Sequence, residues 1–318
     1  MDTINKTNSK NNSEIADARV NRVNQKRKFL GIICGILAAV CYGTNPLGAL
    51  KLYAEGMTTN CVLFYRFGLA WVILAVVMIF RSRSARSKES IKVTPKEFKT
   101  LIGLGFLFAV SSLSLYISFH YMAVGVASTI LFIYPVMTAV IMVCFFKEHL
   151  SWHTAVSLVL SLAGVALLYW SDGEGGLSTL GVILVLLSAL SYALYIIVMD
   201  KSQLRMSSFK INFYVVLCCA LCMLAYSFIG GYPLTLPKTA ASWFYVGWLA
   251  IVPAIMALVL MVYAAKWVGS TTTAILGALE PLTAVLIGLM VFGEAFSWNL
   301  ALGIVLILGS VVLIALKK

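Results

Sequence analysis

The sequence predicts an all-α integral membrane protein with about ten transmembrane helices, arranged as two inverted repeats of five. Three observations predict this fold: the composition, a series of long uncharged stretches and an internal repeat. Of the 318 residues, 61% are hydrophobic and 11% are charged, whereas soluble domains average about 45–50% and 25%. A soluble fold of this size needs more polar side chains to cover its surface. The composition therefore excludes a soluble enzyme.

The long apolar stretches predict the individual helices, because a span needs about 20 apolar residues. Seven stretches carry no Asp, Glu, Lys or Arg, and residues 100–146 are enough for two spans with a turn near residues 123–126. Two more spans carry one charge each, Arg66 in 59–80 and Glu280 in 270–292. These stretches are too long and too evenly apolar for barrel strands, so they predict a helix bundle. The uncharged stretches are 29–50, 100–146, 149–171, 175–199, 211–237, 239–265 and 295–316.

The positive charges predict the orientation in the membrane. Residues 1–28 are rich in Asn, Ser and Lys and are expected to form a disordered cytoplasmic tail, followed by a first helix that is retained rather than cleaved. With the N-terminus inside, seven Lys and Arg of the tail, seven of the loop 81–99 and seven of later loops are cytoplasmic, against two outside. This bias predicts cytoplasmic termini in a plasma (inner) membrane. It also accounts for the net charge of +12 without nucleic acid as a partner.

The two halves of the chain match each other in sequence. Shifts of 146 to 150 residues align an ordered set of pairs, which divides the chain into repeats at 29–171 and 178–318. Because five is an odd number of spans, the second repeat enters the membrane from the opposite side. Inverted repeats are typical of secondary transporters, whose site lies near mid-membrane between the repeats. The pairs include Pro135 with Pro281, Glu148 with Glu294, Trp152 with Trp298, Tyr121 with Trp267, Gly31 with Gly181 and Tyr42 with Tyr192.

This pattern resembles the ten-helix EamA-type members of the drug/metabolite transporter superfamily. The resemblance covers residues 29–318, and only the longer polar tail departs from it. It implies transport of small metabolites, often amino acids or related compounds and frequently outward, and it does not specify the substrate. The residues that carry it are Pro135, Glu148, Trp152, the segment Leu279-Glu280-Pro281, Glu294, Trp298 and the arginine of the second helix, Arg66.

Two charges lie inside predicted spans, where a charge costs several kcal/mol or more and is a functional candidate. Glu280 is expected near mid-membrane, directly before Pro281, on one helix face with Thr273, and its repeat counterpart is Tyr134. Burial favours the protonated carboxyl, so Glu280 is a candidate proton carrier. Arg66 is a candidate partner of Glu280 or of a substrate carboxylate. The alternatives are that Glu280 caps local packing or bonds a tyrosine hydroxyl, and that Arg66 snorkels to the outer headgroups.

Other polar and aromatic side chains are candidates for the substrate pathway. Tyr116 and His120 belong to a polar stripe at the end of the third helix, and a polar face in lipid must turn toward a partner or a cavity. Tyr192 belongs to a similar face on the sixth helix, while Tyr42 and Tyr134 add aromatic surface that suits an amphipathic or aromatic metabolite. The alternatives are interhelical hydrogen bonds and aromatic belts at the membrane interfaces.

The matched residues at helix ends are expected to be structural. Glu148 and Glu294 are expected to bind the N-terminus of the following helix, where negative charge is favoured. The complete structural motif comprises Pro135, Pro281, Glu148, Glu294, Trp152 and Trp298.

The favoured function is alternating-access transport of a small-molecule metabolite, with proton coupling through Glu280. The chain has no P-loop, no GxSxG and no HExxH, and its seven cysteines lie in apolar stretches. No cofactor or metal is therefore expected. The alternatives from other classes are a membrane-embedded enzyme and a non-transporting helper or receptor subunit with a transporter fold. The sequence leaves a homodimer open.

Overall fold

The computed structural model describes residues 25–83, 91–146, 152–169, 178–202, 204, 206–268, 273, 276–277 and 279–315. Within these ranges the regular secondary structure is entirely helical. Seven helices are long and apolar enough to cross a membrane, and three shorter apolar helices accompany them. Together they match the ten expected spans, so the predicted all-α membrane fold is confirmed.

The helices occur in the expected order. The first span, Gln25–Ala54, ends in α2 (Asn45–Ala54). The other helices of the first half are α3 (Thr59–Arg83), α4 (Pro95–Ser118), α5 (Val124–Leu131), α6 (Tyr134–Phe146) and α7 (Trp152–Tyr169). The second half contains α8 (Thr179–Lys201), α9 (Ser208–Gly230), α10 (Ala240–Ile251), the π-helical turn η2 (Val252–Met256), α11 (Ala257–Val268), α13 (Leu279–Phe292) and α14 (Trp298–Ala315).

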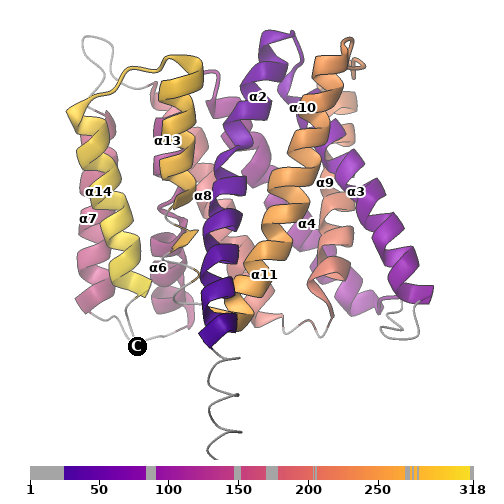
Figure 1. The fold of residues 1–318 in the computed structure, drawn as a ribbon, viewed down its shortest axis with the longest axis horizontal. Coiled ribbons are helices and arrows are strands. Elements are labelled where there is room, and N and C mark those ends of the chain that lie inside the picture. The colour runs from indigo at the N-terminus through magenta and orange to yellow at the C-terminus, as the bar shows by residue number, and fades with distance from the viewer. Residues whose placement is uncertain are drawn as a thin grey trace, which may run out of the picture.

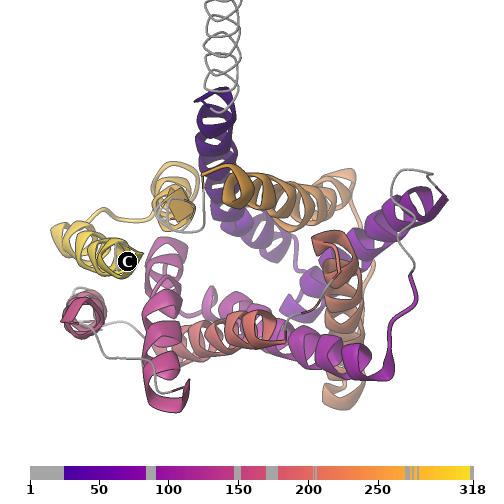
Figure 2. The same cartoon turned by 90° about the horizontal axis from the view of Figure 1, so that it is seen from below.

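The helices stand side by side between two edges of the molecule (Figure 1). The first span, in indigo, starts at the same edge at which α14, in yellow, ends (Figure 1). With an even number of membrane crossings, the first and last spans must have their outer ends at the same edge. Seen along the helices, α7 and α14 form a pair set to one side of the others (Figure 2).

The two repeats interleave rather than sit as separate blocks. The first span of each repeat packs on the third span of the other, as α2 does on α10 and α8 on α4. The second spans, α3 and α9, pack on each other, and so do the fifth spans, α7 and α14. Each repeat therefore buries its apolar faces against the other, and neither forms a closed core alone.

The repeat relationship extends to single contacts. A Cβ at Gly31 would lie 2.9 Å from the Cβ of Trp267, and a Cβ at Gly181 would lie 3.1 Å from the Cβ of Tyr121. In the sequence alignment Gly31 corresponds to Gly181, and Trp267 corresponds to Tyr121. Small residues at both places let the backbones approach closely, as helix packing in membranes favours. The same contact therefore occurs twice, once near each edge of the bundle.

The fourth span of the first repeat is interrupted beside a proline. It divides into α5 and α6 at Phe132 and Ile133, and Pro135 lies in the first turn of α6, where the missing N–H of proline is tolerated. The corresponding proline of the second repeat, Pro281, lies in α13. Irregular backbone inside a membrane span occurs where protein buries it or a cavity adjoins it.

Candidate substrate pathway

Four sequence-predicted residues come together beside the start of α6. Tyr134 starts α6, and its ring lies 4.7 Å from that of Tyr192 on α8, with the ring planes at 81°. Glu280, in the first turn of α13, interacts electrostatically with Tyr42, Tyr134 and Tyr192. The repeat relates Tyr42 to Tyr192 and Glu280 to Tyr134. The four side chains, which we call the central cluster, therefore occupy equivalent positions of the two repeats.

Close backbone packing holds the first span against the start of α13. A Cβ at Gly43 would lie 2.6 Å from the carbonyl oxygen of Glu280, which leaves room only for glycine. Pro281 cannot donate a backbone hydrogen bond to the carbonyl of Gly277, and Pro135 cannot donate to that of Leu131. Each proline therefore removes one ordinary helix hydrogen bond directly beside a residue of the central cluster, Glu280 or Tyr134. Interrupted helices such as α5 and α6 build binding sites in secondary transporters.

Arg66 lies on α3 with 5% of its surface exposed, so it does not reach the headgroups by snorkelling in this conformation. Its Nη1 donates a hydrogen bond to the hydroxyl of Tyr116, which in turn donates to Oδ1 of Asn45 at 3.2 Å. The guanidinium carbon lies 5.3 Å and 5.4 Å from the ring centroids of Phe67 and Tyr116. These contacts fix the orientation of the guanidinium. Among the described residues no carboxylate forms an ion pair with Arg66, and Glu280 is not its partner here.

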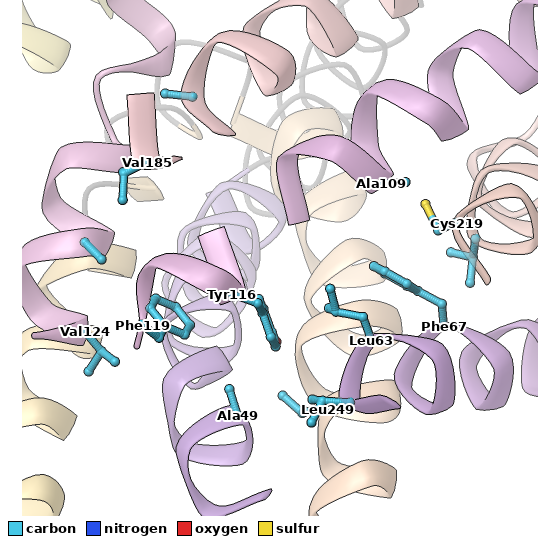
Figure 3. Close-up of a cluster of buried hydrophobic side chains, with 14 of the residues drawn as sticks. Ala49, Leu63, Phe67, Ala109, Tyr116, Phe119, Val124, Val185, Cys219 and Leu249 are labelled. Carbon is cyan, nitrogen blue, oxygen red and sulfur yellow. The ribbon is translucent and has the colours of Figure 1, made fainter. Parts of the chain in front are cut away.

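Tyr116 connects α4 with the first span and α3. It is 1% exposed and belongs to the apolar core that also contains Ala49, Leu63 and Phe119. Figure 3 shows its ring among these side chains. Tyr42 interacts electrostatically with both Arg66 and Glu280. Arg66 is therefore within electrostatic range of the central cluster through Tyr42.

His120 does not join this group and lies exposed at the edge of the bundle where α4 ends. Its ring stacks on Tyr53 at 4.3 Å, and its Nε2 lies 3.1 Å from Oγ1 of Thr59. Partial burial lowers the pKa of His120, so the ring is favoured in its neutral form. It lines a hollow of about 410 Å³ together with Tyr53, Gly56, Met57, Thr58, Thr59, Asn60, Ile117, Tyr121, Tyr226 and Tyr232.

The remaining predicted residues are spread over the fold. Thr273 is buried. Trp152 and Trp298 begin α7 and α14 and are 64% and 79% exposed, as expected of tryptophans that face lipid near an interface. Glu148 lies outside the described residues.

Glu294 binds a different helix from the expected one. Its carboxylate accepts hydrogen bonds from the backbone N–H of Val124 at 2.7 Å and of Gly125 at 3.3 Å. These amides begin α5 in the other repeat, so the expectation that Glu294 binds the following helix, α14, was wrong. Gly293 has a φ of 67° and turns the chain, and the backbone N–H of Glu294 bonds the carbonyl of Gly288. The carboxylate then faces α5, whose first N–H groups have no partners within their own helix.

Two features of the site were missed in the sequence. Asn45 accepts the hydrogen bond that orients Tyr116, whereas in the sequence the pair Asn45-Pro46 indicates only a helix break near the outer end that could line the exit. The π-helical turn η2 contains Pro253 and interrupts the third span of the second repeat, and such turns are frequent at functional sites. A proline in the middle of the apolar stretch 239–265 was the available signal for the second feature.

Known proteins share both halves of this architecture. A model of the EamA-like transporter family matches residues 29–170 and again residues 179–316. The chain belongs to the EamA-like transporter family. The resemblance seen in the sequence is therefore confirmed, and the protein is a multi-pass membrane transporter rather than an enzyme.

Relatives carry matching descriptions. An uncharacterized transporter of Archaeoglobus fulgidus is 27% identical over 215 residues, which cover 68% of this chain and 76% of the relative. An uncharacterized transporter of Clostridium kluyveri is 22% identical over 289 residues, or 89% of this chain and 92% of the relative. A solved structure titled only as the crystal structure of a protein superposes with a TM-score of 0.64 at 16% identity, over 89% of this chain and 95% of its own. It shows the fold alone.

A carboxylate also joins the two repeats at the edge of the bundle. Glu55, directly after α2, accepts hydrogen bonds from the hydroxyls of Ser242 and of Thr239, the latter at 2.7 Å. Both hydroxyls belong to the start of α10 in the other repeat. The hydrogen bond from Ser242, and then that from Thr239, holds the pKa of Glu55 below its ordinary value of 4.5. A lowered pKa means that the folded protein favours the ionised carboxylate.

We expect Glu55→Gln to lower the thermal stability of the detergent-purified protein at pH 7. Because the folded-state pKa is lowered, the stabilisation by Glu55 is full above pH 4.5 and is lost as the pH falls through the folded-state value. The difference in melting temperature between wild type and variant should therefore shrink below pH 4.5. Melting curves between pH 3.5 and 8 test this, with Thr58→Ala as a control at the same edge. A difference in melting temperature that stays constant with pH would contradict the assignment of this stabilisation to the ionised carboxylate of Glu55.

Proposed function

We propose that the protein exports small metabolites, such as amino acids or related compounds, across the plasma (inner) membrane by alternating access. The observation that carries the proposal is the central cluster, in which Tyr42 and Tyr134 of the first repeat meet Tyr192 and Glu280 of the second beside the break between α5 and α6. Interrupted helices and inverted repeats together build a site that either side of the membrane can reach in turn. The outward direction rests on the family resemblance.

Alternating access follows physically from the repeats. Each repeat packs its first span on the third span of the other, so the same set of contacts exists near both edges of the bundle. If the two repeats exchange conformations, the edge that is closed becomes the edge that is open. The two states then differ little in buried area, which allows a substrate of modest affinity to move the equilibrium.

Transport itself is tested by a comparison of cells that express the protein with cells that carry the empty vector. We expect the medium of expressing cells to accumulate at least one small metabolite, and purified protein in proteoliposomes to exchange that compound without forming a product. A membrane enzyme would release a chemically altered compound. A helper or receptor subunit would give no flux in either assay, which would refute the proposal.

Both termini are proposed to face the cytoplasm, because 21 Lys and Arg then lie inside and two outside. We expect single cysteines at Lys88 and Lys201, in a background without the seven native cysteines, to be protected from a membrane-impermeant maleimide in intact cells. A cysteine at Lys238 should react. Reaction of the cysteines at Lys88 and Lys201 with protection of the one at Lys238 would reverse the orientation, and a split between Lys88 and Lys201 would contradict the topology.

Glu280 is proposed to couple transport to protons. It is the one carboxyl in the central cluster and is half-buried among tyrosines, where binding and release of a proton can change with access to water. Since Gln is close in size to Glu but cannot ionise, we expect Glu280→Gln to abolish flux driven by a pH gradient and to leave counterflow of labelled substrate intact. Glu97→Gln, outside the central cluster, is the control. Unchanged gradient-driven flux in the Glu280 variant would exclude the proton role.

A further inference from the structure

Arg66 is a buried charge without an ion-pair partner among the residues that the structure describes. With 5% of its surface exposed it has lost almost all contact with water. The interactions that replace water are one hydrogen bond to Tyr116 and the rings of Phe67 and Tyr116, whose centroids lie 5.3 Å and 5.4 Å from the guanidinium carbon. Removing one partner of a buried ion pair is strongly destabilising, because the remaining charge is uncompensated. A buried arginine of this kind therefore points to an anion that the described residues do not supply.

The unused part of the guanidinium is defined by its hydrogen bonds. Nη1 donates to Tyr116, whereas Nε is buried and has no hydrogen-bond partner. The side edge formed by Nε and Nη2 therefore makes no hydrogen bond to any residue that the structure describes. Two parallel N–H groups on one planar edge match the two oxygens of a carboxylate. This edge belongs to a single guanidinium, so it supplies one positive charge to a bound anion.

The surrounding residues hold the edge in place. Asn45 accepts a hydrogen bond from the Tyr116 hydroxyl. The oxygen of that hydroxyl therefore has a lone pair that accepts the hydrogen bond from Nη1 of Arg66. The second arginine of α3, Arg81, lies fifteen residues further along the helix, or about 22 Å away at 1.5 Å per residue. One isolated charge suits a carboxylate better than a phosphate, which carries up to two charges. Tyr42, which interacts with both Arg66 and Glu280, connects this edge to the central cluster.

We propose that Arg66 is the anion anchor of the transport site and that the transported compounds carry a carboxylate, which binds the Nε–Nη2 edge while Tyr116 and Asn45 orient the guanidinium. This inference rests on the proposed export function and specifies its substrate class. It predicts discrimination between an acid and its neutral amide. A residue that only served structure, or that only paired with Glu280 in another conformation, would affect acid and amide alike.

The test begins with the compounds that expressing cells release. Medium from cells with wild type, with Arg66→Gln and with empty vector is compared by untargeted mass spectrometry. We expect the compounds released by wild type to carry a carboxylate and to disappear in the Arg66→Gln cells. Release of compounds without a carboxylate would overturn this inference and leave the export function standing. Medium identical to that of the empty vector would overturn the export function, and this inference with it.

The decisive measurement is a ratio in proteoliposomes. Flux of the released acid is divided by flux of its primary amide for each variant. A charge-assisted bidentate pair predicts a preference of about 10- to 100-fold in wild type, which should fall to about one in Arg66→Gln. Arg66→Lys keeps the charge without the fork and should give an intermediate ratio, and it decides the question if the Gln variant does not fold. Arg81→Gln, the same residue type on the same helix, should keep the wild-type ratio. An unchanged ratio in both Arg66 variants would overturn the proposal.

Discussion

The hydrocarbon core of a bilayer offers no water, and the rest of this structure depends on that constraint. Backbone groups must then be paired within helices, except where the protein interior replaces the missing partners. The interruption at Phe132–Ile133 is enclosed by protein rather than lipid, since both side chains are at most 3% exposed. The same constraint acts on side chains. Arg66 contacts Tyr116 and Phe67, and Asn45 accepts a hydrogen bond from Tyr116, which reduces the cost of a charge that lipid could not accommodate.

The backbone follows the repeat closely, but the chemistry of the central cluster does not. Tyr134 and Glu280 occupy equivalent positions at the start of α6 and α13, and only one of them ionises. Arg66 likewise has an apolar counterpart, Val215, on α9. A symmetric scaffold supports two similar conformations, whereas an asymmetric set of charges allows one substrate to be bound in one orientation. In the proposed mechanism the symmetry supports the motion, and its local loss supports recognition of the substrate.

Polar contacts join the two repeats at several places, where they can fix one conformation. Glu294 accepts from the first amides of α5, and Asn60 on α3 donates to Ser227 on α9 at 2.8 Å. A hydrogen bond inside a membrane protein is worth about 1 kcal/mol, because the alternative partners are also inside the protein. Contacts of this strength stabilise one conformation of the bundle but are weak enough to break when the conformation changes. Dispersion between closely packed helices, as at Gly43 against Glu280, supplies the larger and less directional part of the packing.

The sequence by itself determined the helical class, the number of spans and the two repeats, because apolar length and the position of charges act locally along the chain. It also identified Glu280 and Arg66, since a charge in an apolar stretch is conspicuous without any structure. Only the tertiary structure decided that Glu280 adjoins three tyrosines, that Arg66 has Tyr116 rather than a carboxylate as its partner, and that Glu294 binds α5. Each of these pairs spans 40 residues or more of chain, and helix periodicity carries no information about which helices become neighbours.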